Sequence, residues 1–383
     1  MFSFIVRLYH NYLIEKSRRY DIQQWKTYLR ENGFRVEESC QEEKEYICFW
    51  KQLSSKVEPY SFRFYSHFMG KVHFIIPEDI GHRVIEHYLN PRRYRDFYND
   101  KCVYEQLFKS DSYTPKLYLC RMGGGVLLDD KYKRAQFNGR GIDFSSSDEL
   151  LAKYLGNSDS VILKPSLDSK GGEGIEKFIR HGSIYVNSDQ SKVLSGSFLK
   201  TYGNNYLVQE AIKQHPFFAQ FNPSSVNTLR ICTYRSVVDE EVIVFACALR
   251  MGSKGSFTDN THSGGVIVKV DLETGRIGNV VYGEYRKPYK IWNDIDFESF
   301  EGYVPNWKRI IEFAKDVASQ IHHMRLLSLD VTLRQNGEPV LIEINVNGFS
   351  FGLPMVLNQI VFGCRFDEVV NYCKKMLNKK DLD

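Results

Sequence analysis

The sequence predicts an α+β fold in which a small glycine-hinged unit and a larger antiparallel sheet follow a helical N-terminal extension. Stretches that alternate apolar and polar residues, as strands do, dominate from Tyr206 onward. Before them, short strands and helices surround a glycine-rich loop at 168–174, and helix-rich, charged sequence forms the N-terminal part. These three observations divide the chain into four expected segments: 1–60, 61–135, 136–205 and 206–383.

Length and composition restrict the class of protein. A chain of 383 residues can bury a substantial core. Its 51 basic and 47 acidic residues give a net charge of +4, which is too small to predict binding to nucleic acid. Eight cysteines form no C-x-x-C pair, which is typical of reduced core residues in a cytosolic protein. No stretch approaches the roughly 18 apolar residues that a membrane-spanning helix needs.

The first 60 residues are expected to be helical, with a break at Asn32-Gly33. The initial apolar run is short and lacks the cleavage pattern of a signal peptide. Residues 1–19 read either as a basic amphipathic helix on a membrane surface or, as we prefer, as a helix packed on the body of the protein. The first reading would place a cytoplasmic chain at the inner face of the membrane.

Helices and strands alternate in the second segment. The pattern predicts a strand at 71–77, a helix at 78–89 that Asn90-Pro91 ends, and a strand at 114–119. A short helix at 99–108, opened by an Asn or Asp cap, carries Lys101 near its start. Lys101 is either a cation directed into a binding cleft or an exposed residue of that helix.

The third segment contains a candidate phosphate-binding loop with Lys170, Gly171 and Gly172. Its glycines would let backbone N–H groups approach an anion closely, although a plain hairpin turn needs the same residues. Neither the Walker motif nor the dinucleotide fingerprint occurs. Lys164 favours the phosphate reading, because a lysine inside an apolar strand suggests a cation presented into a cleft. The elements expected around the loop are a helix at 147–155, strands at 161–165 and 183–187, and a helix at 191–200.

The next strand, expected at 206–209, ends at the acidic residue Glu210. The free backbone groups of Gln209, Glu210, Ala211 and Ile212 suit the edge of a purine, with Glu210 near a ribose. An ordinary edge strand explains the same pattern, and this segment alone does not decide between the two.

Two arginines lie in the strands expected at 228–237 and 241–250. Arg230 is surrounded by apolar residues and therefore needs an anion, which is either a core carboxylate or a phosphate or carboxylate ligand. Arg250 ends the second strand. The polar segment that follows, with Asn260 and His262, has the composition of a loop that closes over a substrate. A strand at 265–270 follows this loop.

The most specific pattern is a hairpin with strands at 328–333 and 339–348, preceded by a helix at 307–323 and followed by one at 366–377. Glu343 and Asn345 are two residues apart and point the same way, and the hairpin brings Asp330 across from them. One face would be packed and the other presented to a ligand. Three such oxygen-bearing side chains suit Mg²⁺, which takes further ligands from water and phosphate. The alternative is a hairpin with a polar outer face.

In this order, and over roughly residues 95–355, these features resemble the ATP-grasp superfamily. Segments 225–230 and 342–348 are further similar to the sugar-transfer-associated branch, which is found with bacterial surface-polysaccharide machinery. The positions that carry the resemblance are Lys101, Lys164-Pro165, the glycine loop, Gln209-Glu210, 227–230, Arg250, 260–265 and the set Asp330, Glu343 and Asn345.

The resemblance implies that ATP is held between a small lid and a larger α+β unit. Lys101, Lys164 and the glycine loop would contact phosphates, 209–212 would surround adenine, and the hairpin set would hold Mg²⁺. Arg230, Arg250 and Asn260 would then be the catalytic residues, acting on the transferring phosphoryl group and the carboxylate. No general base is evident.

The leading expectation is an ATP-dependent carboxylate–amine ligase that forms an acyl phosphate. Its partners would be a small-molecule or glycan carboxylate, such as an acidic sugar of a surface polysaccharide, and an amine such as an amino acid. The N-terminal helix would be the contact with a membrane or a glycosyltransferase. The alternatives are a phosphotransferase acting on a glycan precursor and a non-catalytic nucleotide-binding partner of glycosyltransferases.

Overall fold

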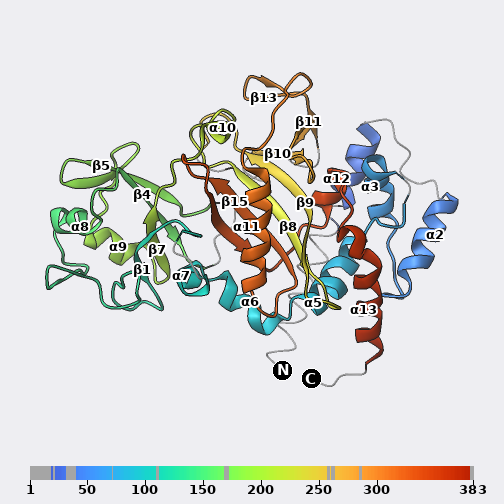
Figure 1. The fold of residues 1–383 in the computed structure, drawn as a ribbon, viewed down its shortest axis with the longest axis horizontal. Helices are drawn as coiled ribbons and strands as arrows, with labels where there is room; N and C mark the ends of the chain where they lie inside the picture. Colours follow the sequence, from blue (N-terminus) through green and yellow to red (C-terminus); the bar gives the residue numbers. More distant parts are fainter. Residues whose placement is uncertain are drawn as a thin grey trace.

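The computed structural model describes residues 19, 22–31, 40–70, 72–108, 112–167, 172–256, 259, 264–283 and 287–379. Two antiparallel sheets, of seven and five strands, lie side by side, with helices packed on their outer faces (Figure 1). The α+β class predicted from the sequence is confirmed. Within the described residues, no helix has the length and apolar character needed to cross a membrane.

The large sheet has the strand order β12-β11-β10-β9-β8-β15-β16. Strong alternation correctly predicts β8, β9, β10 and the terminal hairpin, whereas β11 and β12 lie in a stretch where the pattern predicts no strand. The strands are β8 (Thr228–Arg235), β9 (Val242–Met251), β10 (Val266–Val270), β11 (Ile277–Tyr282), β12 (Pro288–Tyr289), β15 (Leu326–Leu333) and β16 (Pro339–Asn345).

Helices cover both faces of the large sheet (Figure 1). Leu229, Leu249 and Leu329 face α11 (Trp307–Gln320), which fits the helix expected at 307–323. On the opposite face, Tyr234 and Phe245 share a core with helices from both ends of the chain. These are the helical stretch at 22–31, α2 (Gln41–Trp50), α3 (Tyr60–Met69), α12 (Gly352–Val356) and α13 (Phe366–Asn378).

The described N-terminal helices pack on the body of the protein. Leu29, Tyr46 and Trp50 are at most 1% exposed and belong to the same apolar core as the β8 and β9 side chains. The two readings of residues 1–19 stay predictions, because they depend on residues that the structure does not describe. Residues 1–18 and the break at Asn32-Gly33 lie outside the described residues.

The strand expected at 71–77 is not formed. Within 72–77 the backbone makes a turn and then runs as coil, and Ile75 and Ile76 are fully buried against the second core. The apolar run therefore fills a core without a strand partner, which the local pattern cannot distinguish from a strand. The helix expected at 78–89 forms in three parts, α4 (Glu78–Ile80), the π-helical η1 (Gly81–Ile85) and α5 (Glu86–Leu89), and α6 (Arg92–Asn99) follows.

The small sheet has the strand order β1-β7-β4-β5-β6. Its outer face packs on α8 (Asp148–Tyr154) and α9 (Gly196–Tyr202), each capped by a serine side chain. The sheet crosses the expected segment boundaries, because β1 and β7 join it from the neighbouring segments. The strands are β1 (Leu117–Arg121), β7 (Tyr206–Glu210), β4 (Ser160–Pro165), β5 (Glu176–His181) and β6 (Ile184–Asn187).

The remaining helices and strands are short. The helix start expected near residue 100 is present, with the Asp100 carboxylate accepting a hydrogen bond from the Cys102 N–H at 2.9 Å. The short elements are η2 (Lys101–Val103), α7 (Tyr104–Leu107), β2 (Gln136–Phe137), β3 (Arg140–Gly141), α10 (Pro216–Ala219), β13 (Ile291–Trp292), β14 (Ile295–Asp296) and η5 (Gly363–Arg365).

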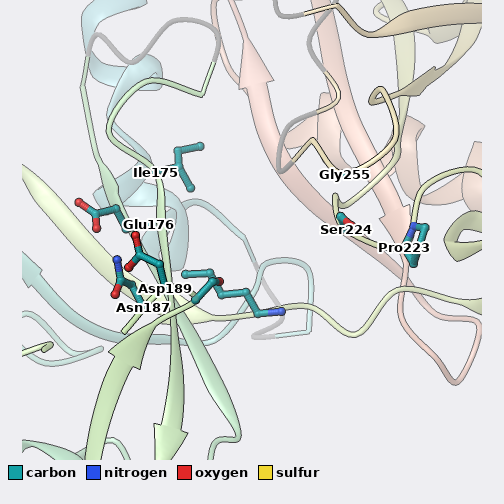
Figure 2. A pocket seen from close by; sticks show the side chains of 9 residues that line it. Ile175, Glu176, Asn187, Asp189, Pro223, Ser224 and Gly255 are labelled. Carbon is teal, nitrogen blue, oxygen red and sulfur yellow. The ribbon is translucent and has the colours of Figure 1, made fainter. Parts of the chain in front are cut away.

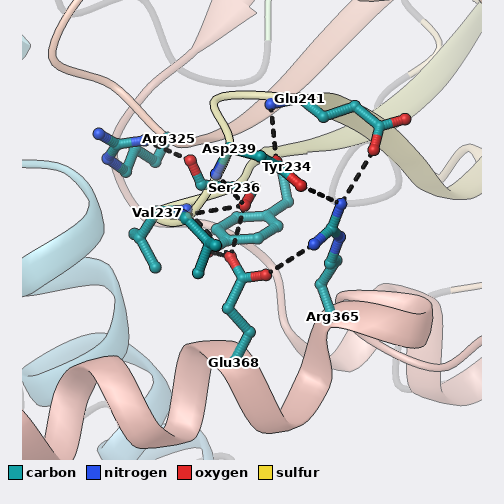
Figure 3. A network of polar contacts seen from close by, with 9 residues as sticks. Tyr234, Ser236, Val237, Asp239, Glu241, Arg325, Arg365 and Glu368 are labelled. Carbon is teal, nitrogen blue, oxygen red and sulfur yellow. Dashed lines mark hydrogen bonds and ion pairs between the residues drawn. The ribbon is translucent and has the colours of Figure 1, made fainter.

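A polar network fastens the C-terminal helix α13 to the turn between β8 and β9 (Figure 3). The Glu368 carboxylate accepts hydrogen bonds from the Tyr234 and Ser236 hydroxyls, both at 2.8 Å, and from the Val237 N–H at 3.0 Å. Arg365, one helical turn earlier, pairs with Asp239 at 2.7 Å. The network fixes the end of the large sheet to the helix that covers it.

The cysteines are free thiols. Five of them are buried, in line with the expectation of core residues: Cys102, Cys120, Cys232, Cys247 and Cys373. The expectation is wrong for Cys48 on α2 and Cys364 on η5, which are exposed, and Cys40 is half-buried.

Candidate functional site

Asp330 on β15 is held by two arginines from neighbouring strands. Its Oδ1 lies 2.5 Å from Arg230 Nε, and its Oδ2 accepts from Arg230 Nη2 at 2.9 Å and from Arg250 Nη1 at 3.0 Å. Burial alone would raise the pKa of Asp330, but the two guanidinium groups outweigh it and leave the pKa below its usual value. Asp330 is therefore a carboxylate at neutral pH.

This arrangement corrects the picture of an open hairpin face. Every residue of β15 is buried, and Asp330 is only 3% exposed, because β15 lies between β8 and β16 and helices cover both faces of the sheet. The anion that Arg230 requires is the core carboxylate of Asp330, one of the two alternatives left open by the sequence. Burial lowers the pKa of Arg230, but Asp330 raises it by more, so the net shift is upward.

The strand register places Asp330, Glu343 and Asn345 on one face. Asp330 lies directly opposite Glu343, and Asn345 lies opposite Ser328, whose carbonyl accepts from Asn345 Nδ2 at 3.2 Å. A bulge at Ile342 shifts the register, so that Val331 pairs with Leu341. The three predicted metal ligands therefore converge as the hairpin pattern indicates.

Lys101 reaches this face from the start of η2. Its ammonium lies 2.9 Å from Glu343 Oε1, and its side chain is only 7% exposed. Its backbone N–H donates to the Ser166 carbonyl at 3.0 Å, which ties it to the end of β4. Of the two readings of Lys101, the buried cation is the one that the structure supports.

Lys164 on β4 lies in the same interior. Burial and, to a smaller extent, the nearby Lys101 charge lower its pKa to about 8, while Glu343 opposes the shift. Lys101, Lys164 and Gln209 line one cavity of about 10 Å³ between the small sheet and β16. That volume is about enough for a single water molecule. The two lysines and Glu343 thus form one cluster, which lies where the two sheets come close together.

Glu210 is engaged by another side chain. Both of its carboxylate oxygens accept from Arg334 Nη1, at 2.7 and 2.8 Å, which links the end of β7 to the turn after β15. Ala211 donates its N–H to the Ser160 carbonyl at 3.4 Å. Within the described part of the chain, the backbone N–H and carbonyl of Ile212 take part in no hydrogen bond.

The remaining predicted residues lie in or beside the loops. Gly172 is described and has φ +82°, a conformation that favours glycine. Lys170, Gly171, Asn260 and His262 fall outside the described residues.

Asp259 is a neighbour of the site that sequence reasoning did not select. Its carboxylate accepts a hydrogen bond from the Thr228 hydroxyl and lies 3.4 Å from Arg250 Nη2. Burial raises its pKa, while Arg250 opposes the rise. In the sequence, Asp259 could have been noticed only as a single carboxylate in the polar segment after Arg250.

A larger opening lies between the tip of the small sheet and two loops of the large unit (Figure 2). It encloses about 580 Å³. Figure 2 shows Asn187 and Asp189 on the small-sheet side, and Ser224 and Gly255 across from them. This opening and the lysine cluster are separate parts of the junction between the sheets.

The sugar-transfer associated ATP-grasp family matches residues 82–370, which include the small sheet, both arginines and the hairpin. The chain belongs to this family. ATP-grasp proteins are generally ATP-dependent ligases. The resemblance found in the sequence is therefore confirmed, and the N-terminal helices before residue 82 lie outside the match.

Solved ATP-grasp structures are similar to the chain at low identity. D-alanyl-alanine synthetase A from Vibrio cholerae is 14% identical over 73% of this chain and 64% of that one, with a TM-score of 0.39. The ATP-grasp ligase PsnB is 11% identical over 74% of this chain and 62% of its own, with a TM-score of 0.36. The L-amino acid ligase from Bacillus licheniformis is 10% identical over 70% of this chain and 42% of its own, with a TM-score of 0.30. Each match spans less than two thirds of the solved chain, and no curated protein matches.

The donor set of this ATP-grasp chain fits a hard cation that is completed by another molecule. Asp330, Glu343 and Asn345 offer oxygen atoms on one sheet face. Over the residues that the structure describes, no three His, Cys, Asp or Glu side chains group as a metal site. Two carboxylates and one amide oxygen leave coordination positions that Mg²⁺ would fill with water or phosphate.

Proposed function

We propose that this chain is an ATP-dependent carboxylate–amine ligase that acts through an acyl phosphate. Its substrates would be an acidic sugar of a surface polysaccharide and an amine such as an amino acid. The proposal rests on the family and on one observation: Arg230 and Arg250 converge on a single oxygen of Asp330.

The charges at the junction suit a polyanion. Lys101, Lys164, Arg230 and Arg250 bring four positive charges to the junction, where the carboxylates of Asp330, Glu343 and Asp259 pair with three of them. Cationic groups in a buried setting can bind a triphosphate and stabilise negative charge that develops during phosphoryl transfer.

Each group has a role in the proposed reaction. Lys101 and Lys164 hold phosphate oxygens of ATP, and the backbone groups of Ile212 hydrogen-bond the adenine edge. Mg²⁺, held by Asp330, Glu343 and Asn345, would neutralise charge on the phosphates. Asp330 also keeps Arg230 and Arg250 aligned, so that they contact the reacting carboxylate and the phosphoryl group.

The chemistry is a double displacement. A carboxylate oxygen bonds to the γ-phosphorus while the bond to ADP breaks, which gives an acyl phosphate. The amine nitrogen then bonds to the acyl carbon, phosphate leaves, and the amine proton passes to phosphate or water. Electrostatic stabilisation and positioning supply the catalysis, since neither step needs a covalent bond to the protein.

The test is ADP release by the purified chain with ATP, Mg²⁺ and pools of sugar acids and amino acids, followed by mass spectrometry. A product lighter by one water than its two components is expected. A product that gains one phosphoryl group would instead identify a phosphotransferase, and absence of substrate-dependent ADP release would identify a non-catalytic binding protein. Unchanged ADP release by Glu343→Gln would refute the metal assignment.

The proposal includes a setting in the cell. We propose that the chain acts at the cytoplasmic face of the membrane, with residues 1–18 as its contact to the membrane or to a glycosyltransferase. Co-sedimentation of the full chain with anionic vesicles tests this, and loss of sedimentation on deleting residues 1–18 is the expected outcome.

A further inference from the structure

The strand that carries two of the proposed metal ligands lies at the edge of the large sheet. β16 is the last strand in the sheet order, with β15 as its neighbour. The bulge at Ile342 shifts the register of this pair directly before Glu343. A bulge disrupts the ladder and bends its strand, so pairing with β15 fixes the residues after the bulge less firmly. A second support on the outer side of β16 would therefore act directly on the positions of Glu343 and Asn345.

The hydroxyl group of Tyr104 supplies such a support. It accepts a hydrogen bond from the Ile344 N–H at 3.0 Å, outside the ladder between β15 and β16. Ile344 joins Glu343 to Asn345 in the strand. A single side chain thus holds the backbone between the two ligands that β16 contributes.

A second contact holds the same edge before the bulge. The Leu341 N–H donates to the Tyr113 carbonyl at 2.7 Å. This bond joins two backbone groups, whereas the bond after the bulge depends on one phenol oxygen. The two contacts lie on either side of Ile342, so together they fix the path of the strand through the bulge.

The Tyr104 side chain is itself held in place. It is 5% exposed and packs in the first core of the large sheet, where its ring meets the Phe108 ring edge to face at a centroid distance of 6.3 Å. Tyr104 begins α7, and Lys101 at the start of η2 lies three residues earlier. The segment that brings the Lys101 ammonium to Glu343 therefore also holds the backbone next to Glu343.

Another buried tyrosine of the large sheet makes the same type of contact away from the site. The Tyr234 hydroxyl accepts from the Val237 N–H at 3.2 Å, and Tyr234 is fully buried. Its ring packs in the second core, on the opposite face of the sheet from the first. Tyr234 and Tyr104 are therefore matched in burial and in hydrogen bonding, and they differ in their distance from the metal ligands along the fold.

We propose that Tyr104 is a positioning residue of the cation site. Its hydroxyl fixes the backbone between Glu343 and Asn345, so that both side chains point to one ion. Mg²⁺ requires near-ideal octahedral geometry, whereas Ca²⁺ accepts flexible arrangements of its ligands. Loss of the hydroxyl therefore weakens the binding of Mg²⁺ more than that of Ca²⁺. This inference rests on the proposed function, since the cation site belongs to it.

The test is calorimetry of ADP binding to the full chain with saturating Mg²⁺, with saturating Ca²⁺ and with EDTA. Tyr104→Phe removes the hydroxyl and keeps the ring. It should bind MgADP about tenfold more weakly than wild type, as expected for loss of a group that orients a metal ligand. The loss for CaADP should be smaller, and metal-free ADP should bind equally well. Tyr234→Phe, the matched control, should leave all three affinities unchanged.

Other outcomes separate this role from the proposed function. Unchanged MgADP affinity in Tyr104→Phe, or an equal loss with Mg²⁺ and Ca²⁺, would overturn the positioning role. Glu343→Gln should remove most of the difference between MgADP and metal-free ADP. If wild type shows no such difference, the cation site itself is refuted, and the role of Tyr104 with it. Circular dichroism shows whether each variant is folded, and Tyr104→Met, which also lacks the hydroxyl, is a second variant with the same expected result.

Discussion

The Lys101 ammonium lies 2.9 Å from the Glu343 carboxylate, so a predicted phosphate ligand and a predicted metal ligand neutralise each other. Asp330, the other carboxylate of the metal set, is likewise bound by Arg230 and Arg250. A divalent cation therefore meets no unpaired carboxylate in this set. A bound phosphate anion would draw Lys101 away from Glu343 and leave that carboxylate free to bind the cation.

We expect Mn²⁺, used in place of Mg²⁺, to bind the chain weakly without nucleotide and strongly with ADP. Lys101→Met should raise the nucleotide-free affinity for Mn²⁺ by about tenfold, because Glu343 loses its partner in a partly buried setting. Electron paramagnetic resonance of free Mn²⁺ measures this. Lys213→Met, which removes an exposed ion pair with Asp159, is the control and should change nothing. Equal Mn²⁺ affinity of wild type with and without ADP would contradict the coupling.

The depressed pKa of Lys164 predicts that ADP binding depends on pH. The pKa is about 8 in the free chain, and a bound phosphate would raise it. Above pH 8, binding must therefore take up a proton, and ADP affinity should fall as pH rises. Calorimetry near pH 8.5, in two buffers of different ionisation enthalpy, measures the uptake. Lys164→Met should abolish it, and persistence in that variant would assign the proton to another group.

The same lysine affects stability with a definite sign. Its folded pKa lies below the unfolded value of about 10.4, so unfolding takes up a proton between these values. The free energy of unfolding of the nucleotide-free chain should therefore contain a term that rises with pH from about 8 to 10.4. Lys164→Met removes that term, which urea unfolding at several pH values detects as a smaller slope.

Asp330→Asn should destabilise the fold as well as the site. It leaves the half-buried Arg230 and Arg250 without a full counter-charge, and breaking such a buried pair costs about 3 kcal/mol. Glu298→Gln, which breaks an exposed pair with Lys290, should cost less than about 1 kcal/mol. Urea unfolding compares the two variants, and equal midpoints would show that the arginines do not depend on Asp330.

The sequence predicted those parts of the fold that depend on local pattern. Alternation located β8, β9 and the terminal hairpin, and helical spacing located α11. Pairings between distant strands are not visible in a local window, so the membership of β1 and β7 in the small sheet was missed. The strand predicted at 71–77 is absent, because its apolar residues are buried in a core without pairing to another strand.

The same limit applies to the site. Residue types and spacing predicted which side chains converge, since Asp330, Glu343 and Asn345 share a face. They did not predict which partners those side chains have, because each partner comes from a distant part of the chain: Lys101 for Glu343 and Arg334 for Glu210.

The Glu368 network should act on stability without affecting the site. Burial raises the pKa of Glu368, but hydrogen bonds from Tyr234 and Ser236 outweigh it, so the pKa is lowered (Figure 3). This contribution is present above the unfolded pKa of about 4.3 and is lost as pH falls through the folded value. Glu368→Gln should therefore reduce the free energy of unfolding by about 1–2 kcal/mol at pH 7, and by less in acid. Glu301→Gln, at an exposed position, is the control. ADP affinity should be unchanged in both variants, and a loss in Glu368→Gln alone would show that α13 communicates with the junction between the sheets.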